Sequence, residues 1–216
     1  IRELSQIPEW RMNFLANGKM FDETKELHDE ILSWSELELK LQNAASIKWM
    51  LLVIPVLTLI SVVPAAMGVT NFFVWIMVLS QWLFLYFFWK TISQYFRFFG
   101  RKSELLSKYM QLLQFIENRE FQSDLMARLK GKVKQPVSAG KVFHQLKSLT
   151  EQFEYRQNIL VGFFLNSFFL WDIRCVYRLW NWHNQHHKKL ADWLEVISET
   201  DALISLANLA NNQRSE

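Results

Sequence analysis

Cysteine, glycine and proline are all scarce in this chain. Cys175 is the only cysteine, which excludes an internal disulfide and a zinc site built from cysteines. Among 216 residues there are only six glycines and four prolines, and no stretch alternates apolar and polar side chains as a half-buried strand does. Half of the side chains are apolar. The composition therefore predicts an all-α fold in a reducing compartment, with Cys175 as a buried and unreactive thiol.

Charge is absent from one long stretch. No charged residue lies between Lys48 and Lys90, and the 41 residues 49–89 are strongly apolar. At about 1.5 Å per residue, each half is long enough to cross the roughly 30 Å hydrocarbon core of a bilayer as a helix. Residues 64–71 include Pro, Gly and Asn, which break helices. We therefore predict two antiparallel membrane-spanning helices joined by a turn, with both outer ends on the same side.

The ends of the apolar stretch carry residues typical of a membrane surface. Trp49, Trp82, Tyr86 and Trp89 lie near the ends, where aromatic rings favour the interface, although Trp75 does not. The flanking basic residues that we predict to face the lipid headgroups are Lys48, Lys90, Arg97, Arg101 and Lys102. By the positive-inside rule, the protein is expected to be membrane-associated with a cytoplasmic helical core. The alternative is a cytoplasmic protein whose hairpin is buried in a large helical core or a dimer interface.

Positive charge is concentrated just after the apolar stretch. Residues 90–148 carry 12 basic and 4 acidic side chains, a net charge of +8, whereas residues 1–48 and 149–216 carry −3 and −2. Anionic lipid headgroups would explain this surplus. Nucleic acid would also explain it, but no recognised nucleic-acid motif lies beside it. A solvated helix face would need neither partner.

Helical spacing of apolar residues predicts helices before the hairpin. Residues 1–18 are predicted to form two short helices with a turn at Pro8, the second ending at Gly18. The next helix is predicted to begin at Asp22 and to run directly into the apolar stretch. Its apolar face consists of Leu27, Ile31, Trp34, Leu37 and Leu41.

After the hairpin, the helical pattern is predicted to end near Gly100 and to resume with a second helix. Residues 130–141 hold four lysines, two glycines and a proline, and they are the clearest predicted loop. Ser138 is predicted to cap the helix that follows this loop.

A third apolar block covers residues 159–171 and is interrupted by Gly162, Asn166 and Ser167. At about thirteen residues it is short for a membrane span. We predict that it is buried core, with a re-entrant membrane segment as the alternative. The last long helical pattern covers residues 172–210.

Candidate chemical motifs are few and incomplete. His183 and His187 have a spacing that suits a metal ion, but Asn184 replaces the glutamate of a zinc-protease motif and no third ligand is indicated. Solvated histidines on a polar helix segment are the expectation. Asp172 and Arg174 are predicted to form an ion pair at a helix start, because no second carboxylate lies nearby for acid–base chemistry. No catalytic, cofactor-binding or metal-binding residue is predicted.

Several segments resemble a known family. The closing stretch from Trp193-Leu194-Glu195 to Ala207 resembles the end of the helical core and lever domain of MutS-type DNA mismatch-repair ATPases. The opening IRELSQIPEWRMNFLANGK resembles the first helices of that domain. The internal landmarks are Phe115-Ile116-Glu117 with Phe121, and Leu165-Asn166 with Trp171-Asp172. They resemble a membrane-associated, MutS-like branch found in bacteria, in which an apolar hairpin interrupts the helical core.

The resemblance implies a long-helix bundle. Residues 1–48 would begin the helical core, residues 49–89 would be the hairpin, and residues 90–216 would complete the core and lever. The chain begins with Ile1, and we expect it to be a piece of a longer protein. A missing C-terminal domain would bind ATP and magnesium, while the family's phosphate-binding loop, magnesium-binding acid and mismatch-reading domain have no counterpart here.

The same resemblance implies partners and a role. A second copy in a homodimer and DNA are expected from the family, and membrane lipid is expected from the hairpin. The chain would couple ATP binding and hydrolysis elsewhere to DNA, membrane or a partner subunit. The hairpin itself departs from soluble mismatch-repair proteins. The alternatives are a two-span membrane scaffold with no nucleotide or DNA role, and a metal-dependent membrane enzyme using His183 and His187.

Overall fold

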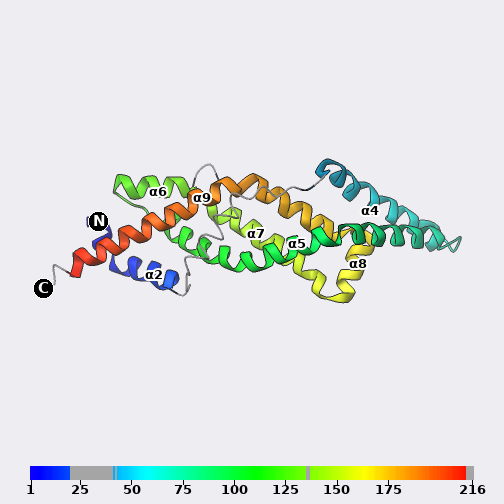
Figure 1. The fold of residues 1–216 in the computed structure, drawn as a ribbon, viewed down its shortest axis with the longest axis horizontal. Coiled ribbons are helices and arrows are strands. Elements are labelled where there is room, and N and C mark those ends of the chain that lie inside the picture. The colour runs from blue at the N-terminus through cyan, green and yellow to red at the C-terminus, as the bar shows by residue number, and fades with distance from the viewer. Residues whose placement is uncertain (20–40, 42, 135–136, 213–216) are drawn as a thin grey trace. The chain divides into compact units, whose positions relative to one another are not determined.

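The computed structural model describes residues 1–19, 41, 43–134 and 137–212, with the backbone alone at residues 19, 100–108 and 212. Every regular element in these ranges is helical, which confirms the predicted all-α fold (Figure 1). The α-helices are α1 (Arg2–Ser5), α2 (Pro8–Lys19), α4 (Ala44–Ala66), α5 (Phe72–Glu117), α6 (Asp124–Lys134), α7 (Ala139–Glu154), α8 (Ile159–Phe169) and α9 (Trp171–Asn212). A short 3-10 helix, η1 (Tyr155–Gln157), links α7 to α8.

The chain forms two compact units, each assembled from distant segments. The first, here called the core unit, comprises Ile1–Glu38, Glu104–Gln145 and Gln185–Glu216. The second, here called the hairpin unit, comprises Leu39–Ser103 and Leu146–Asn184. Helices α5, α7 and α9 each contribute one part to the core unit and another to the hairpin unit.

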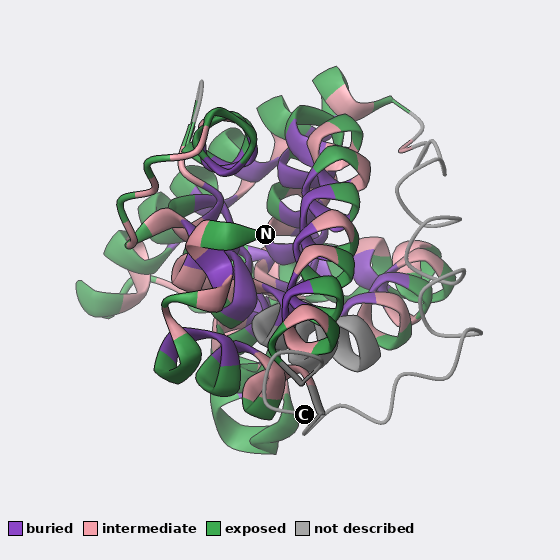
Figure 2. Ribbon diagram, turned by 90° about the vertical axis from the view of Figure 1, so that its left-hand side faces the viewer, coloured by how far each residue is buried: buried purple, intermediate pink, exposed green. Residues whose placement is uncertain are grey.

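The core unit packs apolar side chains between its helices. Leu113 and Ile116 of α5 and Val133 of α6 are fully buried, and the ring of Phe143 lies 5.5 Å from that of Trp193. In Figure 2 the helices that are seen along their length carry buried residues on one side and exposed residues on the other. This is the arrangement that water imposes on an amphipathic helix.

A carboxylate caps the beginning of α6. The backbone N–H groups of Gln122 and Ser123 donate to the two carboxylate oxygens of Glu3, at 2.6 and 2.9 Å. Burial alone would raise the pKa of Glu3, but the hydrogen bonds from Ser123 and Gln122 and the charge of Arg119 outweigh burial and lower it. The negative charge thus satisfies N–H groups that the helix itself leaves free.

The hairpin unit contains the predicted pair of apolar helices. Helices α4 and α5 are joined by a turn after Met67, where Gly68 has φ 73°, a left-handed conformation that favours glycine. The turn lies inside the predicted range, but Pro64 does not end the first helix. α4 continues through both Pro55 and Pro64 and has 23 residues, or about 34 Å.

Several predicted boundaries were wrong. α4 begins after Asn43, whose φ of 58° prevents a helix from continuing straight into the apolar stretch. α5 passes through Gly100 without a break, since a glycine within a helix costs only about 1 kcal/mol and the flanking Ile92 and Phe99 are buried. α2 ends at Lys19, one residue later than predicted. The helix predicted from Asp22 lies outside the described residues.

The predicted loop at residues 130–141 is shorter than expected. α6 extends to Lys134, because Leu129 and Val133 continue the buried stripe that starts at Met126. α7 begins at Ala139, and the carbonyl of Ser138 accepts the first N–H groups of that helix. The Ser138 hydroxyl donates instead to a carboxylate oxygen of Glu117, at 3.0 Å.

Candidate membrane-anchoring site

Helix α4 buries one narrow face, which includes the polar residues Thr58 and Ser61, and exposes most of its large apolar side chains. The buried residues recur every three or four positions, as one helix face: Ile47, Leu51, Pro55, Thr58 and Ser61. The remaining faces expose large aliphatic side chains, with Leu52 61% and Ile60 59% exposed. Only 17% of the most apolar window of α4 is buried by the rest of the chain.

The apolar half of α5 also leaves most of its large apolar side chains exposed. Residues 72–99 form an apolar segment that is long enough to cross a bilayer, and 17% of its most apolar window is buried. Exposed side chains here include Phe72, Leu79, Leu83 and Phe87. Among the described residues, two helical segments have the length and apolar composition of membrane spans, Ala44–Ala66 and Phe72–Phe99.

A buried polar pair joins the two helices. The side-chain amide of Gln81 donates to the hydroxyl of Thr58, and the two residues are only 1% and 0% exposed. Ser61 donates to the carbonyl of Thr58 at 2.6 Å on the same face. Such hydrogen bonds hold helices together where the surroundings offer no water.

The polar pair also fixes the relative depth of the two helix ends. Trp49 is nine residues before Thr58, and Trp89 is eight residues after Gln81. At about 1.5 Å per residue, both tryptophans lie about 12–14 Å from the pair and therefore at a common level.

The predicted basic residues lie at or beyond this level. Lys48 and Lys90 adjoin Trp49 and Trp89, and the side chains of both lysines and of Arg97 are exposed. Arg101 and Lys102 lie further along α5, and their side chains fall outside the described part of the structure. The three described cations thus form a basic rim at one end of the apolar hairpin.

Arginine 174 compensates for a proline in the first apolar helix. Pro55 has no N–H, so the carbonyl of Leu51 lacks its usual partner four residues later. The Arg174 guanidinium donates to that carbonyl at 2.8 Å. The prediction of an Asp172–Arg174 ion pair was therefore wrong.

The partner of Asp172 is Arg156. An Arg156 nitrogen lies 3.6 Å from a carboxylate oxygen of Asp172, and both side chains are largely buried. Burial raises the pKa of the Asp172 carboxyl, and the nearby guanidinium opposes that rise. Arg156 also lies 5.4 Å from the ring of Trp89 and 5.3 Å from that of Phe96, within the range of cation–π attraction. Sequence spacing gave no signal for this cluster, since its members are far apart in the chain.

Helix α8 was predicted to be buried core, and this was wrong. Ile159 is 84% exposed, and Leu160, Phe163 and Phe164 are also exposed. Its buried residues are instead Gly162, Asn166 and Ser167, so α8 buries small and polar residues and exposes apolar ones. α8 meets α9 at an angle of 80°, and Leu170 between them has φ 50°.

Contacts with α5 place α8 beside the apolar hairpin. The indole N–H of Trp82 donates to the Ser167 hydroxyl at 3.0 Å, and the Trp82 ring lies 5.6 Å from that of Phe163. Trp82 adjoins Gln81, so Ser167 lies within about one helical turn of the depth of the polar pair. Gly162 permits the close approach of η1 to α8, because a Cβ there would meet the Arg156 carbonyl oxygen at 3.1 Å.

The remaining candidate residues show no catalytic constellation. His183 is buried and His187 is partly exposed, so the expectation of solvated histidines was wrong for His183. His186 beside them is also buried, and burial followed by the charge of Lys189 lowers its pKa. Among the described residues, no three His, Cys, Asp or Glu side chains are grouped to hold a metal ion. The prediction for Cys175 is confirmed, since it is a buried free thiol whose pKa is raised to about 12 by burial and by Asp172.

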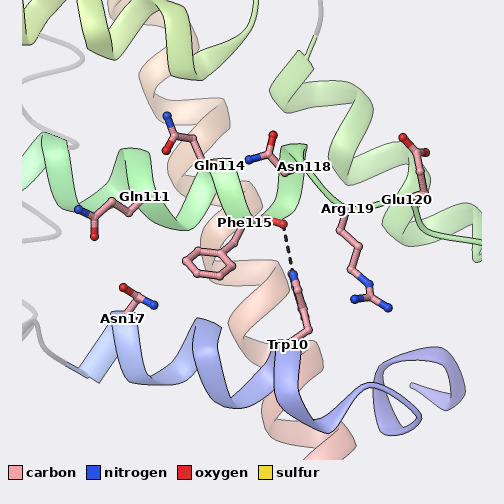
Figure 3. A pocket seen from close by; sticks show the side chains of 8 residues that line it. All are labelled: Trp10, Asn17, Gln111, Gln114, Phe115, Asn118, Arg119 and Glu120. Atoms are coloured by element: carbon pink, nitrogen blue, oxygen red, sulfur yellow. Dashed lines mark hydrogen bonds between the residues drawn. The ribbon is translucent and has the colours of Figure 1, made fainter.

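A polar pocket of about 710 Å³ opens in the core unit (Figure 3). It lies between α2 and the end of α5, and the indole N–H of Trp10 donates to the Phe115 carbonyl at 3.2 Å at its centre. That carbonyl belongs to the last turn of α5, where the helix supplies no partner. The other polar lining groups are mainly carboxamides, those of Asn17, Gln111, Gln114 and Asn118.

Comparison with known protein families, with characterised proteins and with solved structures gives no match to this chain. The resemblance to MutS-type proteins stays a prediction from the sequence.

Proposed function

We propose that this chain is a membrane-anchored helical connector. Helix α4 and the apolar half of α5 cross the bilayer, and the basic rim faces anionic headgroups at the cytoplasmic surface. The helices beyond the rim transmit motion between the membrane and the other parts of a longer, MutS-like ATPase.

The inverted burial of the hairpin carries the membrane part of this proposal. Leu52, Ile60 and Leu83 are exposed while Thr58 and Gln81 are buried. In water each exposed aliphatic side chain forgoes about 1.5–3 kcal/mol of burial free energy, and buried polar groups must find partners. In hydrocarbon the exposed side chains are well solvated, and the polar groups are best placed against each other. Lipid is therefore the surrounding that suits both sets of residues.

Helix α8 supports a third point of membrane contact. Its exposed aromatic and aliphatic face lies beside α5 near the depth of the polar pair, and the chain turns back at Leu170 into α9. We assign α8 as a re-entrant segment that enters the apolar layer and returns to the same side. This assignment replaces the prediction of buried core.

The length of the helices supports the connector role. α5 has 46 residues and α9 has 42, about 69 and 63 Å at the rise of an α-helix. Tightly packed helices move as rigid bodies between discrete arrangements, so they transmit displacement over such distances. ATP and magnesium binding in a following domain, pairing with a second copy, and contact with DNA all follow from the family resemblance.

Alkaline extraction tests the membrane part. The chain is expressed in bacteria, and membranes are washed at high pH, which releases peripheral proteins but leaves spanning ones. We expect the chain to remain in the pellet. Full release into the supernatant would contradict the proposal.

The reading frame of the gene tests the connector part. We expect it to continue past Glu216 into a phosphate-binding loop, GxxxxGK[ST], and the full product to hydrolyse ATP. A frame that ends near residue 216 would favour the two-span scaffold without nucleotide chemistry.

A further inference from the structure

A second pocket lies at the base of the first apolar helix, within the hairpin unit. It has a volume of about 680 Å³ and is bordered by the start of α4 and the start of α9. The residues that matter for its chemistry are Lys48, Trp49, Leu52, Trp171, Arg174 and Arg178. Three of these six are cations, and no carboxylate from the described part of the chain belongs to the lining.

Two of the cations are held in place by the fold. Arg174 is anchored by its hydrogen bond to the Leu51 carbonyl, and its Nε–H is buried without a hydrogen-bond partner. Arg178 is anchored by a 2.7 Å hydrogen bond to the side chain of Gln152. A guanidinium that the fold already holds in place loses little conformational freedom when it binds an anion, so charge-assisted hydrogen bonds in this pocket would be favourable.

The other lining residues are apolar and extend toward the exposed face of the hairpin. Trp49 and Leu52 are 67% and 61% exposed, and they continue into the aliphatic surface of α4. Trp171 borders the same pocket, and its indole N–H donates to the Gln152 carbonyl at 2.9 Å. A ligand of this pocket would therefore meet cations at one end and an apolar surface at the other.

The pocket lies at the level of Lys48 and Trp49, where charge stops and the apolar stretch begins. The Arg156 cluster at the exit of α5 is less suited to an anion, because Asp172 already lies 3.6 Å from that guanidinium. From its charge, apolar wall and depth, we propose that the Lys48–Arg174–Arg178 pocket binds the phosphate of an anionic phospholipid, with an acyl chain along Leu52. This inference rests on the proposed membrane anchoring and adds a specific lipid class to it.

Lipid retention in defined bilayers tests the site. The chain is reconstituted in nanodiscs of phosphatidylcholine alone or with one-fifth phosphatidylglycerol, and the lipids that remain after mild detergent release are identified by native mass spectrometry. We expect one phosphatidylglycerol to stay bound to the wild type. In the Lys48→Gln/Arg178→Gln variant we expect at least about tenfold less retention, because two cations near the headgroup are removed. Arg174 is left intact because it also supports α4.

A matched variant separates a specific pocket from general attraction. Lys90→Gln/Arg97→Gln removes the same charge beyond the same end of the hairpin but outside the pocket, and it should retain the lipid. Equal losses in both variants, or no preference for phosphatidylglycerol in the wild type, would overturn the site. Circular dichroism of each variant establishes that the helices are intact, and the wild-type preference decides the question if a variant unfolds.

A soluble phosphate is the competing ligand, and one further arm distinguishes it. Glycerol phosphate is added to the detergent-released complex at the concentration of the lipid. We expect it to leave the lipid in place, whereas displacement would show that the pocket prefers a soluble phosphate. If the chain enters no bilayer at all, the anchoring and this site both fail. If it enters bilayers without lipid preference, only this site fails.

Discussion

Helices α4 and α7 each bury one face, but the faces that they expose differ in chemistry. Both bury one stripe with a spacing of three and four. The buried face of α7 includes Val142, Leu146 and Thr150, and that of α4 includes Ile47, Leu51, Thr58 and Ser61, so both mix apolar and polar residues. The exposed faces differ, because α7 exposes polar side chains whereas α4 exposes leucine, valine and isoleucine. Helical periodicity therefore identifies a packed face in both cases. The residues on the exposed face then indicate whether that face contacts water or lipid.

The comparison predicts that identical substitutions have different costs in the two helices. Leu146 is 1% exposed in α7, and Leu146→Ala should lower the free energy of unfolding by about 2–5 kcal/mol through a cavity. Leu59 is 50% exposed in α4, and Leu59→Ala should cost only roughly 0.5 kcal/mol of membrane insertion. Denaturant titration of both variants in detergent micelles measures the difference. Equal destabilisation would mean that the exposed face of α4 is packed against protein.

An introduced charge should reverse which helix pays the larger free-energy cost, so that the substitution in α4 costs more than the one in α7. Leu57→Arg places a charge at mid-span and should cost about 2.5–3.5 kcal/mol of insertion free energy. Gln145→Arg on the exposed face of α7 should change stability by less than about 0.5 kcal/mol. The membrane-bound fraction after alkaline extraction measures both effects. An unchanged fraction for Leu57→Arg would count against the span.

The buried polar pair gives a smaller effect. Thr58→Val keeps the shape of the side chain but removes the acceptor of the Gln81 amide, and it should destabilise the hairpin by about 0.6–2 kcal/mol. Ser80→Ala is the control, because the exposed Ser80 hydroxyl bonds only within its own helix, to the Met77 carbonyl. Detergent-induced unfolding compares the variants. Equal stability of Thr58→Val and wild type would show that the pair contributes little.

The smallest expected effect on stability comes from the Glu3 cap in the core unit, and this effect depends on pH. The pKa of Glu3 is lowered in the folded chain, so its stabilising contribution is present above the unfolded pKa and is lost as pH falls through the lowered folded value. Glu3→Gln replaces one carboxylate oxygen that accepts a hydrogen bond at the start of α6. It should lower the free energy of unfolding by about 1 kcal/mol at neutral pH and by much less in acid. Thermal unfolding at several pH values, with Glu9→Gln as the charge-matched control, measures this. A pH-independent cost would contradict the capping role.

The sequence predicted those features that depend on local composition. Uncharged residues between Lys48 and Lys90 predicted the hairpin, and the glycine-containing turn was placed within a few residues. Local composition gave wrong helix ends where tertiary packing determines whether a helix continues. The glycines and lysines near residue 131 suggested a loop, but the buried stripe ending at Val133 keeps that segment helical. Pro64 suggested a helix end, although α4 continues to Ala66.

The residues that complete the site could not be found by spacing. Arg174 acts on the Leu51 carbonyl 123 positions away, and its role depends on the missing N–H of Pro55. Gln81 and Thr58 are 23 positions apart, so no helical spacing relates them either. The third apolar block was assigned to the core because, at about thirteen residues, it is short for a membrane span. Its length and composition do not distinguish a helix buried in protein from a short one that faces lipid. The distinguishing signal was present in the small and polar positions of α8, Gly162, Asn166 and Ser167, which share its buried face.

Accessibility at Leu57 tests the central claim most directly. A spin label is attached at Leu57→Cys in bilayer-reconstituted protein and, in a second sample, at Gln145→Cys. Cys175 should stay unlabelled, because its buried thiol has a pKa of about 12. Lipid contact predicts that dissolved oxygen reaches the label at 57 while a water-soluble nickel complex does not, and that the reverse holds at 145. Nickel access at residue 57 equal to that at residue 145 would contradict a lipid-facing α4.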